Sequence, residues 1–148
     1  MKEVSIGPAS REELPRIVEL LDDGGLPPDG LEDHLPTILV ARLHGRVVGS
    51  AALELYGTAA LLRSVVVRRD LRGTGLGSRL TEAALRLSRE FGVAEAYLLT
   101  ETADLFFPRF GFRNISRSRV PSSVRSSVEF TSACPASARA MALDLRGG

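Results

Sequence analysis

A chain of 148 residues has the length of a single domain with a sizeable hydrophobic core. Its composition, 44% hydrophobic and 25% charged with a formal net charge of +1, is typical of a globular protein and excludes a disordered or fibrous class. The sequence has no polybasic run of the kind that binds nucleic acid or a membrane surface, and no apolar stretch near the roughly 18 residues that a membrane span needs. We therefore expect one domain over residues 1–148, without a nucleic-acid or membrane partner.

The first half of the chain predicts one strand, one helix and then a run of antiparallel strands. A capping-box pattern at Ser10 and Glu13 marks the start of the helix, and Gly24-Gly25 ends it. Two-residue turns at His44-Gly45 and Gly57-Thr58 join the later strands into a meander. The predicted elements are a strand at 4–6, the helix from 10 to 23, an irregular proline-rich segment at 26–36 with one helical turn, and strands at 37–43, 46–56 and 61–67.

The second half begins with a glycine-rich turn and a long amphipathic helix, which Gly92 ends. Because the next strand is reached through that crossover helix, it should lie parallel to strand 61–67. The predicted elements are a helix at 75–91, a strand at 94–100, a short helix at 102–109, a strand after residue 112, a loop with one helix at 116–127, and a strand at 138–145. Together the two halves predict an α/β (α+β) fold, with a mixed, mostly antiparallel sheet flanked by helices.

The junction between strand 61–67 and helix 75–91 carries the clearest functional signal. The strand ends in three valines, and three glycines at spacing two follow within residues 73–77. Glycines let backbone N–H groups come close to an anion, and the N-terminus of the next helix adds its dipole and its unpaired N–H groups. We therefore predict a phosphate-binding site at this turn.

The spacing of the glycines shows which of the known phosphate-binding motifs this turn matches. A dinucleotide fingerprint requires G-x-G-x-x-G and a P-loop requires Gly-Lys-Ser/Thr, and neither occurs here, although a glycine-rich turn can also arise for steric reasons alone. The segment Arg72-x-x-Gly75-x-Gly77 resembles the pyrophosphate-binding motif of the GNAT (Gcn5-related N-acetyltransferase) family. The resemblance extends over most of the chain through three further segments, Val65–Val67, Tyr97–Thr100 and Phe106–Phe112.

A closer resemblance is carried by three groups of residues. They are Leu62–Val65, Leu99–Ala103 with Phe106-Phe107, and a tail that contains Val120-Pro121, Arg125 and Cys134–Ala138. Together they resemble the small GNATs associated with arsenic resistance, and they are similar to the acetyltransferase portion of N-acetylglutamate synthases. This resemblance implies acetylation of the α-amine of a small anionic amino acid, either glutamate-like or a toxic arsinic or phosphinic analogue.

The family resemblance also implies acetyl-CoA as the co-substrate. The backbone of the glycine-rich turn would hold the pyrophosphate, Arg72 would add a charge-assisted bond, and the end of the preceding strand would pair with the pantetheine arm. There the N–H of Val67 would polarise the thioester carbonyl, as an oxyanion hole does. The predicted cofactor-binding residues are Val65, Val66, Val67, Arg72, Gly73, Thr74, Gly75, Leu76, Gly77 and Ser78.

The acceptor amine must lose a proton before it attacks, and Glu54 is the carboxylate that we predict as the base. Strand alternation puts Glu54 on one face with Ala52 and Tyr56, beside the central strand. A surface position for Glu54 is the alternative, and Glu101 is the second candidate.

Many GNATs carry a tyrosine that protonates the departing thiolate, and this chain has Phe107 in its place. Tyr56 or Tyr97 is the candidate replacement. A thiol with a pKa of about 8.5 is a good leaving group, so the missing acid should slow the reaction without disabling it.

Arg63 lies in an otherwise apolar strand, where an unpaired charge is costly to bury. We predict that it binds the carboxylate of the acceptor, with a structural ion pair to Glu54 or Glu101 as the alternative. Hydroxyl groups and one further cation complete the predicted acceptor site, namely Ser64, Thr100, Thr102 and Arg125.

The isolated Cys134 is expected to be a buried or incidental thiol. His34 and His44 are expected to be incidental loop and turn residues, and because no metal-ligand spacing accompanies them we predict no bound metal. The N-terminus lacks the apolar region of a secretory signal, and a single cysteine suits a reducing compartment, so we expect a cytoplasmic protein. Two other functions stay open, acetylation of protein or peptide N-termini and a non-catalytic acetyl-CoA sensor. The antiparallel strands and the C-terminal region are also compatible with a homodimer.

Overall fold

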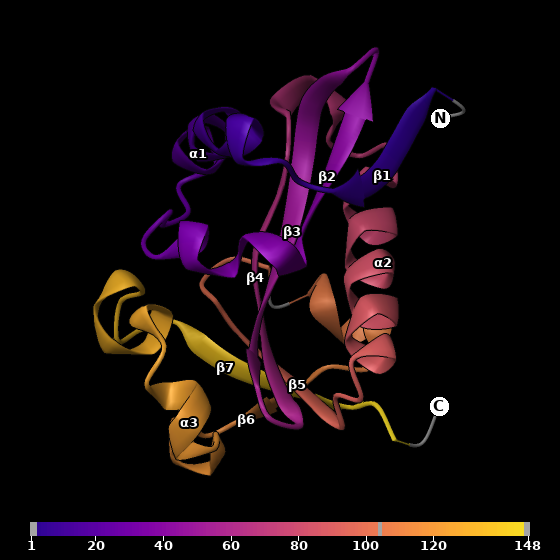
Figure 1. Cartoon of the computed structure of the whole chain (residues 1–148). Coiled ribbons are helices and arrows are strands. Elements are labelled where there is room, and N and C mark those ends of the chain that lie inside the picture. Colours follow the sequence, from indigo (N-terminus) through magenta and orange to yellow (C-terminus); the bar gives the residue numbers. More distant parts are fainter. Residues whose placement is uncertain (1–2, 104, 147–148) are drawn as a thin grey trace.

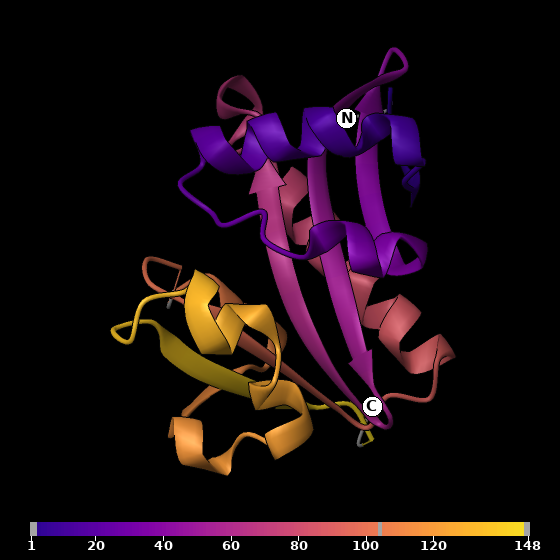
Figure 2. The same ribbon diagram turned by 60° about the vertical axis from the view of Figure 1, so that its left-hand side comes forward.

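The computed structural model describes residues 3–103 and 105–146 of the chain. The described residues form a seven-stranded mixed sheet with the order β1-β2-β3-β4-β5-β7-β6, with helices on both faces (Figures 1 and 2), which confirms the predicted fold class. The strands are β1 (Val4–Pro8), β2 (Ile38–Leu43), β3 (Arg46–Tyr56), β4 (Ala59–Val67), β5 (Glu95–Thr100), β6 (Arg113–Ile115) and β7 (Arg139–Asp144). The α-helices are α1 (Leu14–Asp23), α2 (Leu76–Glu90) and α3 (Ser122–Arg125). Short 3₁₀ turns cover Arg11–Glu13, Leu31–Thr37, Arg69–Leu71, Phe107–Phe110 and Arg117–Arg119, and a π-type turn covers Glu129–Ala133.

The pairing of β4 with β5 divides the sheet into two halves. The two strands are parallel, as the crossover through α2 predicts, whereas the other neighbouring pairs of described strands are antiparallel. The β4–β5 register holds for the three pairs that join Ala59–Leu61 to Glu95–Tyr97. Beyond those pairs the two strands diverge (Figure 2), so the sheet opens along the second half of β4.

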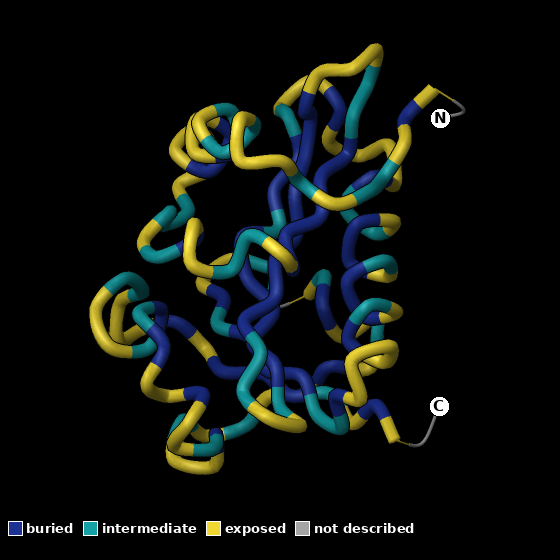
Figure 3. The backbone as a smooth tube through the Cα atoms, viewed as in Figure 1, coloured by how far each residue is buried: buried dark blue, intermediate teal, exposed yellow. Residues whose placement is uncertain are grey.

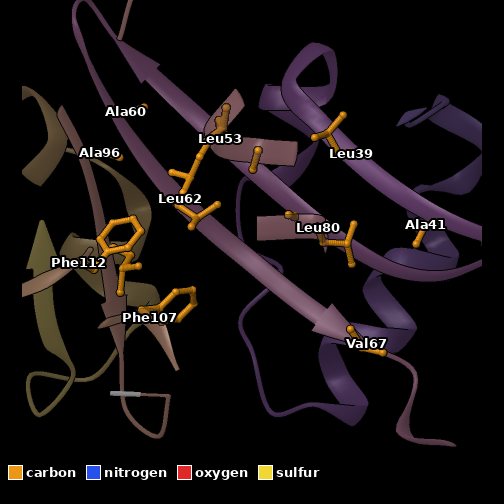
Figure 4. Close-up of a cluster of buried hydrophobic side chains, with 14 of the residues drawn as sticks. Leu39, Ala41, Leu53, Ala60, Leu62, Val67, Leu80, Ala96, Phe107 and Phe112 are labelled. Atoms are coloured by element: carbon orange, nitrogen blue, oxygen red, sulfur yellow. The ribbon is translucent and has the colours of Figure 1, made fainter. Parts of the chain in front are cut away.

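Helix α2 covers one face of the sheet and supplies most of its apolar packing. Leu76 and Leu80 are buried against strand residues such as Leu53 and Leu62 in the largest hydrophobic cluster (Figure 4). Gly49 of β3 lets the helix approach closely, because a Cβ atom at this position would lie 2.9 Å from Leu80 Cδ1. The buried interior of the sheet and the inward side of α2 appear as dark blue segments in Figure 3.

Helix α1 packs on the opposite face, where it buries Ile17 and Leu21 against β2 and β3 (Figure 2). The 3₁₀ turn Arg11–Glu13 that leads into α1 has the predicted capping box, in which the backbone N–H of Ser10 donates to Glu13 Oε1 at 2.8 Å. Glu13 also binds Arg42 of β2 through two 2.8 Å hydrogen bonds. These hydrogen bonds from Arg42 are the main reason that the pKa of Glu13 falls to about 2, so this ion pair fixes the helix to the sheet at neutral pH.

The segment around α3 forms a smaller layer on the α1 side of the sheet (Figure 2). Val120 and Val124 around α3 pack against Leu61 and Tyr97. The short helix expected at 102–109 includes residue 104, which lies outside the described residues, and the structure has a 3₁₀ turn at Phe107–Phe110. The π-type turn at 129–133 was not predicted from the sequence. None of the helices within the described ranges has the length and apolar character needed to cross a bilayer.

Candidate active site

A cavity of about 1050 Å³ opens where β4 and β5 diverge. Its wall is built by the second half of β4, the end of β5, the glycine-rich turn, residues 24–27 after α1, and parts of the segment 129–138. The volume is in the range of sites that hold a small molecule or cofactor. We call residues 65–67 and 72–78 the turn wall, and Arg63, Ser64, Glu129 and Cys134 the charged wall.

The turn wall is shaped mainly by the backbone. Gly73 and Gly75 have φ angles of 82° and 88°, which glycine adopts without the steric cost of a Cβ atom. Gly75 is the N-cap of α2, and the next residues include Gly77 and Ser78 on the cavity wall. Since the first N–H groups of a helix have no partner within the helix, this end of α2 is suited to an anion.

Most of the predicted cofactor-binding residues line the cavity, and the exceptions are Thr74 and Leu76. Thr74 Oγ1 donates to the carbonyl of Leu71 at 2.6 Å, and Leu76 is buried in the core, so these side chains shape the turn. Arg72 lines the cavity and donates from Nε to the carbonyl of Val67 at 3.0 Å.

A β-bulge in β4 separates the turn wall from the charged wall. The register of β4 against β3 shifts so that Arg63 faces Ala52 while Val66 faces Ser50, and Ser64 has a positive φ of 59°. The carbonyl of Ser64 accepts a 2.7 Å hydrogen bond from Ser50 Oγ, which holds the bulge in place. Strict alternation along β4 would therefore assign each residue after the bulge to the wrong face of the sheet.

The Arg63 side chain is fully buried, and four groups share its guanidinium. Nη1 donates to Glu54 Oε2 and to the carbonyl of Asp29, both at 2.8 Å. Nη2 donates to the carbonyl of Pro27 at 3.1 Å, and Nε donates to Ser64 Oγ at 3.1 Å. The structural ion pair with Glu54 is therefore present, and because Arg63 also lines the cavity, its role in binding an acceptor carboxylate stays a prediction.

Glu54 is 1% exposed and is not among the residues that line the cavity. Burial alone would raise the pKa of Glu54, but hydrogen bonds from Ser127, Tyr56 and Arg63 outweigh it and leave the pKa below its usual value. His34 Nε2 lies 3.7 Å from Glu54 Oε2, although the sequence marked this histidine as incidental. The prediction that Glu54 is the base is untested, and its position away from the cavity and its low pKa count against it.

Glu129 is a second buried glutamate, which sequence reasoning missed. It is 5% exposed and lines the cavity. Its contact with Arg63 is long, with 3.5 Å between Oε2 and Arg63 Nε, and Oε1 accepts a hydrogen bond from the Cys134 thiol, a weak donor, with 3.5 Å to Sγ. Burial is the main reason that the pKa of Glu129 is raised. Burial of Cys134 itself, followed by the nearby Glu129 carboxylate, raises the pKa of Cys134 to about 12.

The remaining predicted acceptor residues separate into two groups. Ser64, Thr100 and Thr102 line the cavity, and so does the exposed Glu101, whereas Arg125 lies exposed on α3 and outside the cavity wall. Thr100 Oγ1 is already engaged, since it accepts from the backbone N–H of Ala103 at 3.0 Å.

The candidates for the missing acid also differ in position. Phe107 lines the cavity, but Tyr56 and Tyr97 do not. The hydroxyl of Tyr56 donates to Glu54, and burial followed by that carboxylate raises the pKa of Tyr56 to about 12. Within residues 3–103 and 105–146, no three His, Cys, Asp or Glu side chains gather as a metal site would require.

Comparison with known proteins shows the family of the chain. The sequence profile of the acetyltransferase (GNAT) domain matches residues 34–114, more than half of the chain. The chain belongs to the GNAT acetyltransferase family. The matched region of this GNAT protein runs from the segment before β2 to β6, and so includes β4, β5 and the glycine-rich turn.

Two curated relatives are each 31% identical to this GNAT protein over the residues that align. One is an uncharacterized N-acetyltransferase of Chlorobaculum tepidum, matched over 97 residues that make up 65% of this chain and 62% of the relative. The other is an amino-acid acetyltransferase of Mycobacterium tuberculosis, matched over 83 residues that make up 55% of this chain and 47% of the relative. The match thus spans about half to three fifths of the length of these relatives.

The fold is shared with N-acetylglutamate synthase from Neisseria gonorrhoeae, solved with coenzyme A and N-acetyl-glutamate. The two structures superpose with a TM-score of 0.82 at 21% identity, over 97% of this chain and 35% of the synthase chain. At this level of identity the similarity establishes the fold.

Proposed function

We propose that the protein transfers an acetyl group from acetyl-CoA to the α-amine of a small anionic amino acid. The observation that carries this proposal is the cavity between the diverging strands β4 and β5, because a helix N-terminus suited to an anion and a cluster of buried charges both lie on its wall. A phosphate-bearing donor and a charged acceptor could then meet along the free edge of β4.

The turn wall suits the acetyl-CoA donor. Backbone N–H groups at the start of α2 would hold the pyrophosphate, and Arg72 would add a positive charge beside them. Beyond Leu61, β4 is no longer paired with β5, so its backbone can accept an extended pantetheine arm. The N–H of Val67 is our candidate for polarising the thioester carbonyl.

The charged wall suits an anionic amino acid as the acceptor. Arg63 would attract the acceptor carboxylate, and the hydroxyls of Ser64, Thr100 and Thr102 offer further hydrogen bonds. The names of an amino-acid acetyltransferase and an N-acetylglutamate synthase among the similar proteins support a glutamate-like acceptor. An arsinic or phosphinic analogue of glutamate, acetylated for resistance, is the finer form of this proposal.

The test is acetyl-CoA-dependent thiol release with a panel of amines: glutamate, its phosphinic and arsinic analogues, other amino acids, polyamines and a short peptide. We expect release with glutamate or its analogues, and analogues alone would support detoxification. Release with the peptide alone would replace the proposal by N-terminal acetylation. If acetyl-CoA binds by calorimetry but no amine reacts, the amino-acid acceptor is rejected, and the function shifts to a macromolecular acceptor or to a non-catalytic acetyl-CoA sensor.

The conservative variant Arg63→Lys tests the acceptor site separately. Lysine keeps the charge but loses the planar fork that binds carboxylates in a bidentate manner. We expect the KM for the acceptor to rise much more than the KM for acetyl-CoA, and an unchanged acceptor KM would remove the reason for an amino-acid carboxylate at this site. A cytoplasmic location and a homodimer stay predictions, which cell fractionation and sedimentation equilibrium test.

A further inference from the structure

The two buried glutamates beside Arg63 differ in how strongly their carboxylates are already hydrogen-bonded and in whether they line the cavity. Glu54 accepts from Arg63 at 2.8 Å and from Tyr56, and it lies behind the cavity wall. Glu129 lies on the wall, and its carboxylate oxygens are held through contacts of 3.5 Å to Arg63 and Cys134. Charge-assisted N–H···O hydrogen bonds are normally about 2.7–2.9 Å long, so the Arg63 contact is weak, and a thiol is a weak donor; Glu129 therefore keeps capacity for a stronger partner.

Hydrogen bonds on both sides of Glu129 hold its backbone in place. Glu129 N donates to Ser127 Oγ at 3.1 Å, and the carbonyl of Glu129 accepts from the backbone N–H of Cys134 at 3.0 Å. The second bond closes the π-type turn over residues 129–133, a rare geometry that is often found at functional sites. These bonds fix the backbone of Glu129 beside the cavity, on whose wall the residue lies.

We propose that the Glu129 carboxylate binds the ammonium group of the acceptor and takes its proton. This inference rests on the acetyl transfer proposed above. In the balanced step, one ammonium proton moves to Glu129, the amine nitrogen forms a bond to the thioester carbonyl carbon, and the carbon–sulfur bond breaks. The second proton lost by the nitrogen goes to the CoA thiolate, and Glu129 releases the first proton to solvent.

The charges that face Glu129 come from each element packed against it. They are Arg63 of β4, Glu54 of β3, Asp29 in the segment after α1, and the Cys134 thiol. Burial raises the pKa of Glu129 and the two acids add to this effect, while Arg63 opposes it. A raised pKa moves a carboxylate toward the operating pH, where a general base is most effective.

The experiment is the pH dependence of kcat/KM for the acceptor in the wild type, Glu129→Gln, Glu54→Gln and the surface control Glu90→Gln. We expect kcat/KM of Glu129→Gln to be about 100-fold lower than that of the wild type at neutral pH. This difference in kcat/KM between the variant and the wild type should become smaller at alkaline pH, because an acceptor with an ammonium pKa of about 8 is then deprotonated in solution. Acetyl-CoA affinity, measured by calorimetry, should stay unchanged, and Glu90→Gln should match the wild type throughout.

Other outcomes would overturn the inference. If Glu129→Gln keeps the wild-type dependence of kcat/KM on pH, Glu129 is not the base. If only Glu54→Gln loses the fall of kcat/KM at acidic pH, the base is Glu54; if neither variant loses it, the base is solvent. If Glu129→Gln does not fold, Glu129→Ala serves as the second variant, and its rate should rise with added formate; no rise would reject the role. If the wild type acetylates none of the amines, the proposed function itself fails, and the role of Glu129 fails with it.

Discussion

The turn wall and the charged wall belong to the same cavity, but the chain builds them in opposite ways. One continuous stretch from the end of β4 to the start of α2 makes the turn wall, and its shape and its hydrogen-bond donors come mainly from the backbone. Side chains and carbonyls from four distant segments, 27–34, 54–56, 63–64 and 127–134, make the charged wall and its support. A local wall of this kind can be predicted from sequence, whereas the distant one depends on the fold.

The largest effect should follow from removing the central cation of the charged wall. Arg63→Ala leaves Glu54 buried without its partner and two carbonyls without their donor, so we expect unfolding free energy to fall by about 3–5 kcal/mol. Urea denaturation measures this loss. Adding Glu54→Gln should recover part of it, and the exposed Arg125→Ala is the matched control, with a change within about 0.5 kcal/mol. Equal losses in both arginine variants would contradict the description of a buried network.

The same substitution at the two buried glutamates should have opposite effects on stability. Glu54→Gln should cost about 2 kcal/mol, because Arg63 loses its charged partner, whereas Glu129→Gln should be neutral or stabilising at neutral pH, because it removes a poorly compensated charge. Thermal unfolding of both variants is the measurement. Destabilisation of similar size in the two variants would show that Glu129 is as well paired as Glu54.

The pH dependence of stability should separate the two glutamates further. The folded pKa of Glu54 is lowered, so its contribution is present above the unfolded pKa of about 4.3 and is lost as the pH falls through the folded pKa. The folded pKa of Glu129 is raised, so its contribution is fully present below about pH 4.3 and is lost as the pH rises through the folded pKa. The stability gap between wild type and Glu129→Gln should therefore close on acidification.

On the turn wall, backbone geometry should matter more than any side chain. Gly75→Ala forces a left-handed φ on a residue with a Cβ atom, at a cost of roughly 1–2 kcal/mol, and we expect acetyl-CoA affinity to fall about tenfold. Gly45→Ala is the matched control, since Gly45 has a φ of 80° in a hairpin that does not line the cavity. Both variants should lose similar stability, but only Gly75→Ala should lose affinity.

The smallest effect is expected at Arg72. Its side chain is 45% exposed, so solvent screens its charge, and Arg72→Ala should weaken acetyl-CoA binding only about threefold, or roughly 0.7 kcal/mol. The difference should shrink at high salt. Calorimetry at two salt concentrations measures the acetyl-CoA affinity, and Arg86→Ala, at an exposed position of α2, is the control. If Arg72→Ala lost as much affinity as Gly75→Ala, side chains would matter as much as the backbone on the turn wall.

The sequence predicts most of the fold because its signals are local. Turn pairs such as His44-Gly45, the amphipathic pattern of α2 and the crossover rule give the strands, the main helix and the parallel β4–β5 pair. The bulge at Ser64 has no such signal, because a serine at positive φ is held there by Ser50 from the neighbouring strand. The bounds of short turns, such as Phe107–Phe110, depend on packing in the same way.

The candidate site shows the same limit. Arg63 is conspicuous as a charge in an apolar strand, but whether it meets Glu54 or a ligand depends on β3 pairing and on residues 27–29. Glu129 lies in a serine-rich stretch without periodicity, and its position on the cavity wall depends on the π-type turn. His34 contacts Glu54 through the segment before β2, which composition marks only as irregular.

The three-pair junction between β4 and β5 has a consequence for hydrogen exchange. Past Leu61 the amides on the β5-facing edge of β4 lack a neighbouring β5 strand, so they should exchange with solvent faster than the amides of β3 that pair with β2 and β4 on both sides. A ligand laid along this edge would supply the missing acceptors. Deuterium uptake along residues 62–67 would then report occupancy of the cavity directly, without any need for turnover.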